Sequence, residues 1–419
     1  FRNISLQPEY NYAYSYIKTD NPLYRLDKIS GRDSSLFDRL PSATSILATV
    51  LDNGNTYHFT EYQNSHQFNF CYRDLHSKLL KCEISVNLPV RIAHANLYYQ
   101  RMGRHDVSRQ SIFFEPNIWL RGNAWEIKAK MNSELPDLTT MVNYRDDSNP
   151  MNIILGNTQL RNIHYYDIEG GKTFEGKKHS RLNINTGYHQ TDNAVAYSLV
   201  FDKQTGVSTV QPISVNGNYR IDLGIGYTRS LDKKEKLSID NQASFNYNHN
   251  VDMAMVQGAT QSQRSIVNNW KISNVLKLNY RLDDNYEFTL HGGGTYYLIK
   301  SQREGFSNIH AGDYNIGVNV QVALPWKLQL TTDLTMFARR GYQLSEMNTT
   351  DWIWNAQLSR SFINKKLLVK LQGFDILRQL SNTQYLMNAQ GRTETWNNSI
   401  PRYMMLSLSW RFNVNPKKK

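Results

Sequence analysis

The residues that could carry metal, acid–base or phosphate chemistry occur without the spacing that such sites need. Eleven histidines are present, but no two have the His-x-x-x-His spacing that would bring two imidazoles together on a helix. The triglycine run at 292–294 lies inside an alternating segment, so it predicts close packing or a bulge rather than a phosphate cradle. Serine, histidine and aspartate follow no distinctive order. We therefore expect no enzyme, no metal site and no cofactor.

The two cysteines, Cys71 and Cys82, flank a polar break and could face each other in a hairpin. Cys71 alternates with the apolar Phe70 and Tyr72, so it points away from their face. Cys82, in contrast, shares a face with the apolar Ile84. Because directly opposed residues of a hairpin point to the same side of the sheet, we expect two unpaired thiols, one on each face.

Charged residues that alternate with apolar ones have a more regular setting. On the inside of a wide barrel such residues either contact a plug domain or line a watery path. The candidates for this role are Arg220, Asp222, Lys271, Lys277, Arg281, Lys327, Asp333, Lys370 and Arg411. Their role depends on the elements that position them.

Alternation with a period of two residues dominates the chain wherever a pattern is legible. The segments 4–16, 219–228, 270–282, 314–324 and 328–336 each place apolar and aromatic residues on one face and polar residues on the other. Runs of ten or more residues exceed the five or six usual in soluble sandwiches and match a tilted membrane strand. A soluble β protein is the less favoured alternative.

The breaks between these segments alternate between short and long. Short breaks fall near 74–78, 121–124, 175–180, 231–235, 282–285, 325–326 and 363–366, and long ones near 19–56, 101–108, 144–162, 200–216, 252–265, 302–311, 341–350 and 378–400. Tight turns at one end and long loops at the other are typical of outer-membrane barrels. The pattern predicts an all-β fold, a transmembrane antiparallel up-and-down barrel with about sixteen strands in this chain.

Composition agrees with this class. Of 419 residues, 40% are hydrophobic, 12% aromatic and 20% charged, and no apolar run approaches the roughly 18 residues of a membrane helix. The net charge of +12 could indicate nucleic acid, but basic residues gather in short polar breaks, which favours solvated turns and no nucleic-acid partner. The chain begins at Phe1 without a signal peptide, so we expect a processed form or a fragment.

The last alternating segment carries the strongest single signal. Its apolar face consists of Met404, Leu406, Leu408, Trp410 and Phe412. A final amphipathic strand that ends in an aromatic residue resembles the signal by which the barrel assembly machinery recognises its substrates. Residues 414–419 follow as a basic tail, which we expect in the periplasm.

Several stretches resemble TonB-dependent-receptor-like outer-membrane proteins of the Bacteroidetes type. They are the early segment ISLQPEYNYAYSY, the loop at 149–157, and the ending with VKLQGFDILRQ from Val369 and GRTETWNNSIPRYMMLSLSWRFN from Gly391. The family's barrel has 22 strands, an N-terminal plug and a TonB box. This chain departs from that pattern, with about sixteen strands and neither plug nor TonB box.

The resemblance implies that residues 1–413 are the C-terminal barrel portion of such a receptor in the bacterial outer membrane. The function it implies is uptake of an unknown nutrient, with outer-membrane lipid, a plug domain and TonB as partners, the last two outside this chain. A self-contained sixteen-stranded porin is the first alternative. A non-transporting surface barrel, an adhesin or an assembly component, is the second.

Three structural expectations follow from this interpretation. The short breaks lie in the periplasm and the loops at 144–162 and 378–400 outside the cell. Leu223, Leu278, Val320 and Leu330 face lipid. The first strand, at 3–16, pairs with the last strand only in a complete barrel, and we expect both to have open edges.

Overall fold

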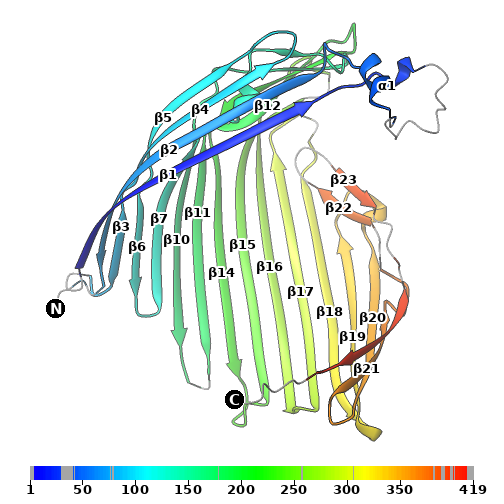
Figure 1. Cartoon of the computed structure of the whole chain (residues 1–419). Helices are drawn as coiled ribbons and strands as arrows, with labels where there is room; N and C mark the ends of the chain where they lie inside the picture. Colours follow the sequence, from blue (N-terminus) through cyan, green and yellow to red (C-terminus); the bar gives the residue numbers. More distant parts are fainter. Residues whose placement is uncertain are drawn as a thin grey trace, which may run out of the picture.

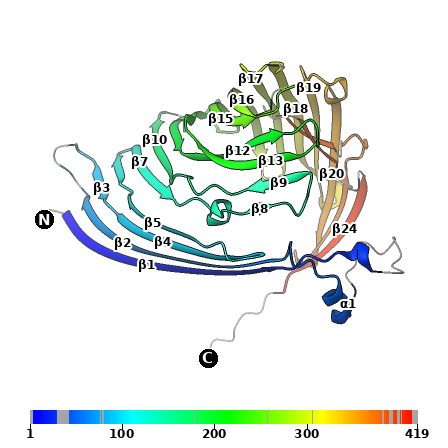
Figure 2. The same cartoon turned by 90° about the horizontal axis from the view of Figure 1, so that it is seen from above.

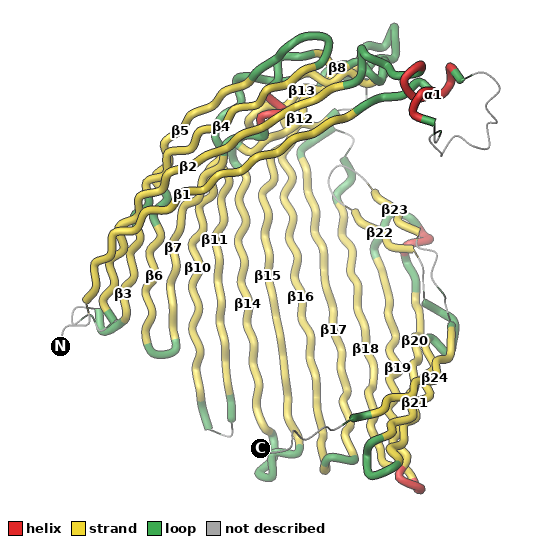
Figure 3. The backbone as a smooth tube through the Cα atoms, viewed as in Figure 1, coloured by secondary structure: helices red, strands yellow, loops and turns green. Residues whose placement is uncertain are grey.

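The computed structural model describes residues 4–29, 41, 43–75, 77, 80–177, 179–255, 258–304, 306–380, 383–387, 392–396, 400 and 402–412. Strands dominate it (Figure 1), and Figure 3 shows its few helical turns in the connections between strands. Within this part of the chain no helix is both long and apolar enough to cross a membrane. The basic tail at 414–419 lies outside the described residues.

One large sheet forms the wall of the molecule. Its strands are β1 (Ile4–Asn21), β2 (Tyr57–Asp74), β3 (Glu83–Asn87), β4 (Val90–Gln100), β5 (Val107–Phe114), β6 (Asn117–Gly122), β7 (Trp125–Glu134), β10 (Ile163–Glu175), β11 (Arg181–Asp192), β14 (Asn218–Ser230), β15 (Leu237–Ala254), β16 (Gln263–Asp283), β17 (Tyr286–Ser301), β18 (Ile309–Leu324), β19 (Leu328–Arg340), β20 (Thr350–Phe362), β21 (Leu367–Phe374) and β24 (Tyr403–Trp410).

The remaining elements are short and lie in the connections. They are β8 (Arg145–Asp146), β9 (Asn152–Leu155), β12 (Ala194–Phe201), β13 (Ser208–Val215), β22 (Thr383–Met387), β23 (Arg392–Trp396), the helix α1 (Thr44–Thr49) and the 3-10 turns η1 (Leu26–Lys28), η3 (Leu138–Met141), η4 (Pro325–Lys327) and η5 (Ser345–Met347).

The wall is antiparallel, and each strand pairs with its neighbours in chain order. β3 and β4 run end to end opposite β2, and β5 and β6 run end to end opposite them, so the 18 strands occupy sixteen positions. Pro89 and Pro116 lie at these two interruptions, where a residue without an N–H costs no ladder bond. Pro8 instead lies inside the continuous register of β1, an edge strand, without a bulge. The expected fold class and strand number are confirmed.

Short and long connections alternate as expected. The strands next to the seven short breaks meet at one end of the wall, and the described strand ends next to the eight long breaks lie at the other (Figure 1). The start of β1 lies beside the short turn that follows β2, and the end of β24 lies beside the short turn that precedes β21. The first strand therefore starts, and the last strand ends, on the short-turn side of the wall. One boundary differs from the expectation: the long break expected near 200–216 starts earlier, because the wall strand β11 already ends at Asp192.

The two faces of the wall differ in polarity. The ladder register places Leu278, Leu290, Val318 and Leu334 side by side on the convex face. At the end of the sheet, Leu406 and Leu408 on this face are 64% and 68% exposed. So much exposed leucine requires an apolar surrounding, and membrane lipid provides one. Seen from above, the wall is an arc that encloses the small strands (Figure 2).

The arc is open within the described residues. β1 pairs with β2 and β24 with β21, but no ladder joins β1 to β24. Both therefore present one free backbone edge, as expected. Both cysteines are free, as expected, with Cys71 half-buried and Cys82 buried. Cys82 directly precedes β3, so it is not on a strand face.

Small strands fill the long-loop end of the arc. β12 pairs with β13, β13 runs parallel to β9, and β8 completes this four-stranded sheet. At one side the hairpin packs on β15 through Ala196, Val215 and Val251. At the other, η3 packs with its Leu138 on Leu97 of β4. The small sheet thus connects two parts of the wall across the interior.

The polarity of the two faces predicts how the wall tolerates charge. We expect Leu223→Arg and Leu278→Arg to cost about 2–4 kcal/mol of folding free energy near the bilayer midplane. The matched variants Gly224→Arg and Asn279→Arg, on the opposite face, should cost far less, and a Cβ at Gly224 meets no atom within 4 Å. The fraction of heat-modifiable folded barrel on gels measures the difference. Equal losses in both sets would refute the lipid-facing assignment.

The alternation of connections predicts the orientation. In a background with both native cysteines replaced by serine, Gln204→Cys, at the exposed tip of the β12–β13 hairpin, should react with a membrane-impermeant maleimide on intact cells. Lys234→Cys, exposed in the short turn between β14 and β15, should react only after the outer membrane is permeabilised. The reverse pattern would invert the topology.

Candidate functional site

A connected line of charged side chains crosses the concave face from β7 to β14. Lys130 Nζ lies 3.5 Å from Asp167 Oδ2, and His189 Nδ1 lies 2.5 Å from Asp167 Oδ1. His189 Nε2 is 3.4 Å from Asp222 Oδ2, which also accepts a hydrogen bond from Arg220 Nε at 2.6 Å. Charged and hydrogen-bonding side chains on four adjacent strands are therefore linked along the lumen wall.

Glycines make room for this line. Gly187 lies beneath the His189 ring, and a Cβ at that position would be 2.9 Å from Nε2. Together with Gly171 and Gly224 it opens a hollow of about 300 Å³, rimmed by acidic and basic side chains. Such a surface can hydrogen-bond a polar solute or a polar domain. It has no nucleophile and base in a catalytic arrangement, and no cluster of metal-ligating residues occurs in the described part of the chain.

Of the nine charges expected to line the lumen, Arg220 and Asp222 are the two that contact each other. Lys271 lies over the Tyr297 ring, with Nζ 5.8 Å from its centroid. Asp333 Oδ2 accepts a hydrogen bond from Asn355 Nδ2 at 3.0 Å. These contacts keep the concave face polar on β16 and β19 as well.

The other expected charges lie apart. Lys277 and Lys370 occupy strand positions in β16 and β21, and Arg281 pairs with Asp284 in the adjoining short turn. Lys327 belongs to the turn η4 with a φ of 60°, so it is not on a strand face. Arg411 follows the end of β24, where its backbone N–H donates to the Lys366 carbonyl. These two positions differ from the expectation, because β19 begins after Lys327 and β24 ends before Arg411.

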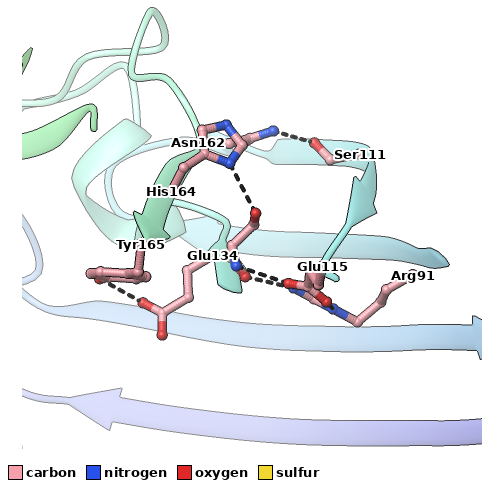
Figure 4. Close-up of polar contacts among 8 residues, drawn as sticks. Arg91, Ser111, Glu115, Glu134, Asn162, His164 and Tyr165 are labelled. Atoms are coloured by element: carbon pink, nitrogen blue, oxygen red, sulfur yellow. Dashed lines mark hydrogen bonds and ion pairs between the residues drawn. The ribbon is translucent and has the colours of Figure 1, made fainter. Parts of the chain in front are cut away.

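A second polar site lies where β5 separates from β7 (Figure 4). The Arg91 guanidinium donates to Glu115 at 2.7 Å and to the Ser133 carbonyl at 2.5 Å. The Glu115 carboxylate accepts the Ser133 backbone N–H at 2.8 Å. Two side chains thus bind the β7 backbone groups at the place where the neighbouring strand turns away.

The same place contains a hollow of about 670 Å³ with polar walls. Tyr165 donates to Glu134 Oε2 at 3.1 Å, and the Ser133 hydroxyl lies 2.8 Å from His164 Nδ1 (Figure 4). A serine beside a histidine could indicate a nucleophile, but Ser133 is only 3% exposed. The buried serine hydroxyl is therefore poorly placed to attack a substrate, and its hydrogen bond to His164 fixes β7 against β10. The hollow, named here the polar cleft, offers hydrogen-bonding groups to a solute.

Arg101 ties three of the long connections together. Its side chain is 1% exposed and donates to the Gly54 carbonyl at 3.2 Å and to Asn55 Oδ1 at 2.5 Å. It also pairs with Asp146 Oδ1 at 2.8 Å and lies over the Tyr144 ring. A buried guanidinium with this many partners fixes the loop after β1 and the small sheet to the end of β4.

Electrostatics in this cluster favour the charged forms. Burial works to lower the pKa of Arg101, but the hydrogen bond and the charge of Asp146 outweigh it and raise that pKa. Burial works to raise the pKa of Asp146, but hydrogen bonds from Ser148 and Arg101 bring that pKa below the usual aspartate value. Both groups are therefore ionised at neutral pH.

Sequence reasoning missed the residues that build these sites. Asp167 lies between Tyr166 and Ile168, so the period-two pattern could have placed it on the lumen face, whereas His189 is followed by the polar Gln190 and its segment has no such clear alternation. Arg91 and Glu115 follow and precede Pro89 and Pro116, which mark the interruptions that they bridge. For Arg101 the sequence holds no local signal, because its partners come from two distant loops.

The Arg101 cluster predicts a local change of stability. We expect Arg101→Met to lower the free energy of opening of the loops around residues 54 and 146 by about 2 kcal/mol, the value of hydrogen bonds to a charged group. Hydrogen exchange of these loops should accelerate about thirtyfold. The control Arg104→Met, which removes an exposed pair with Asp106, should change exchange by less than about fivefold. Similar acceleration in both variants would contradict the proposed stabilisation of these loops by Arg101.

The pH dependence of the same cluster follows from the lowered pKa of Asp146. A depressed carboxyl pKa contributes stability above the unfolded-state value, near 3.9, and this stability is lost as the pH falls through the lower folded-state value. Asp146→Asn should therefore accelerate loop exchange at pH 7 and match the wild type once the pH lies below the folded-state pKa of Asp146. A difference between the two proteins that persists unchanged at low pH would contradict the charge-based explanation.

One family model matches part of the chain. Residues 260–410, from β16 to β24, match the outer membrane protein beta-barrel family. No curated protein matches the chain. Among solved structures, an outer membrane protein of Vibrio cholerae, OmpT in its trimer form, is 11% identical over 94% of this chain and 96% of its own, with a TM-score of 0.27. OccK5 (OpdH) of Pseudomonas aeruginosa is 9% identical over 96% of this chain and 98% of its own, with a TM-score of 0.24.

The family match and the strand architecture together give the class of the protein. It is a bacterial outer-membrane β-barrel protein, located in the outer membrane.

Proposed function

We propose that the chain forms part of the barrel of a TonB-dependent-receptor-like transporter that takes up a nutrient across the outer membrane. The observation that carries this proposal is the polar interior beneath an inward-folded sheet. A charged line with its hollow and the polar cleft both face the lumen, while β12, β13, β9 and β8 lie across its long-loop end (Figure 2). A solute would meet binding groups here rather than an open channel.

The partners in this proposal lie largely outside the chain. Strands outside the present sequence would cover the free edges of β1 and β24, because an unpaired backbone edge is costly in lipid. A plug domain would contact the lumen charges, and TonB would supply the energy coupling. The apolar face of β24 would be the feature that the barrel assembly machinery recognises. No catalytic step belongs to this function.

Energy coupling separates this proposal from a sixteen-stranded porin. Cells with and without the protein are compared for uptake of a panel of small nutrients, and the comparison is repeated after depletion of TonB. We expect a solute whose uptake falls at least tenfold in both cases. Purified barrel in a planar bilayer should conduct ions poorly. Uptake that depends on the protein but persists without TonB, together with steady conductance, would contradict the proposal and favour the porin.

A matched pair of variants, one in the lumen and one on the convex face, tests whether the hollow lies on the path of the solute. Gly187→Leu should fill the hollow beneath His189, where even a Cβ is crowded, and should reduce uptake of the identified solute. Ile225→Leu, on the convex face of β14, changes the same strand without entering the lumen and should leave uptake unchanged. Equal uptake by both variants would exclude the hollow from the solute path.

A further inference from the structure

An apolar groove lies on the convex face at the last four strand positions of the wall. It encloses about 570 Å³ and is lined mainly by aliphatic side chains from β19, β20, β21 and β24. Leu330, Leu358, Leu371 and Met404 form its floor and sides. The ladder register aligns the first three of them across neighbouring strands, and Met404 lies opposite Gly373 of β21.

The groove is deep because residue 373 is a glycine and because the chain after it turns back along β20. The β20–β21 ladder ends at the pair Ala356 and Gly373. The next residues turn back along β20, and the Ile376 backbone N–H donates to the Trp354 carbonyl at 2.8 Å. The Ile376 side chain then covers Gly373, where a Cβ would be 3.3 Å from its Cδ1. Ile376 thus forms a raised wall at the long-loop end of the groove.

A single cation lies at the rim. Arg402 directly precedes β24, lines the groove and is exposed. Within the described ranges no carboxylate pairs with its guanidinium. Trp352 and Trp354 lie at the same end of β20 and are 41% and 38% exposed. Exposed tryptophans at a strand end mark the membrane–water interface, so Arg402 lies at the depth of lipid headgroups.

We propose that this groove is a binding site for an anionic lipid of the surrounding outer leaflet. One acyl chain lies along Leu358 and Leu371, and the phosphate of the headgroup binds Arg402. The guanidinium supplies charge-assisted hydrogen bonds to phosphate oxygens. The site is independent of any solute that passes through the lumen, because it lies on the opposite face of the wall.

The guanidinium must provide the selectivity of this site. Any acyl chain can cover an apolar groove, and lipid tails gain little from exchanging one apolar neighbour for another. The headgroup is different, because a basic residue at the interface attracts an anionic lipid over a neutral one. The groove holds the chain in register, and Arg402 selects the headgroup.

Native mass spectrometry of the folded barrel tests the site with two lipids of identical chains, phosphatidylglycerol and phosphatidylcholine. We expect the wild type to retain phosphatidylglycerol about fivefold better, the preference expected from one basic residue. Arg402→Gln should abolish the preference. Arg411→Gln, the same change at the opposite end of β24, should preserve it.

The groove itself is tested by filling it. Ala356→Trp should lower retention of phosphatidylglycerol to the level of Arg402→Gln, and Ala356→Leu serves the same purpose if the larger side chain prevents folding, which heat modifiability reports. Absence of a preference in the wild type would overturn the proposal and would indicate that the groove is covered otherwise, for example by this chain's own β21–β24 connection. A preference that survives both filling variants, or that survives Arg402→Gln, would also overturn it.

Discussion

Inside a membrane no water is available to a backbone N–H or C=O, and this constraint determines the rest of the structure. Each wall strand must pair along its length, so long antiparallel ladders run from β1 to β24. Where a backbone group has no partner in a neighbouring strand, a polar side chain forms the hydrogen bond instead. At the separation of β5 from β7, Arg91 and Glu115 bind the carbonyl and the N–H of Ser133 that a neighbouring strand would otherwise have bound.

The same constraint explains why so much of the wall could be predicted from the sequence. A strand with lipid on one side and a polar interior on the other must alternate strictly, so residues such as Leu223 and Gly224 reveal their faces without knowledge of their partners. Each turn at the short end needs only a few polar residues, and all seven were found by composition. Strand number and connection lengths then followed from counting.

Features that depend on distant partners could not be predicted in this way. The segment of β12 and β13 reads as the extension of a wall strand and a polar loop, yet it folds inward and pairs in parallel with β9, some 55 residues earlier in the chain. Arg101 has no distinctive neighbours, and its burial arises only when loops from two other regions meet. Lys327 fits the alternation of β19, but Pro325 begins a turn that removes it from the strand.

The convex face is therefore mostly apolar because the membrane leaves no partner for an unpaired polar group. A polar side chain is tolerated on this face when its hydrogen bonds are made within the protein. Asn241 of β15 and Asn274 of β16 lie on that face, among the leucines that alternation predicts there. Their amides bond to each other in both directions, at 3.1 and 3.3 Å, and Asn241 also donates to the Val275 carbonyl. Paired amides leave few polar groups for lipid to solvate, which is how transmembrane segments accommodate such side chains. A single asparagine here would break the rule, whereas the pair obeys it, because the membrane penalises unsatisfied hydrogen bonds rather than polar residues as such.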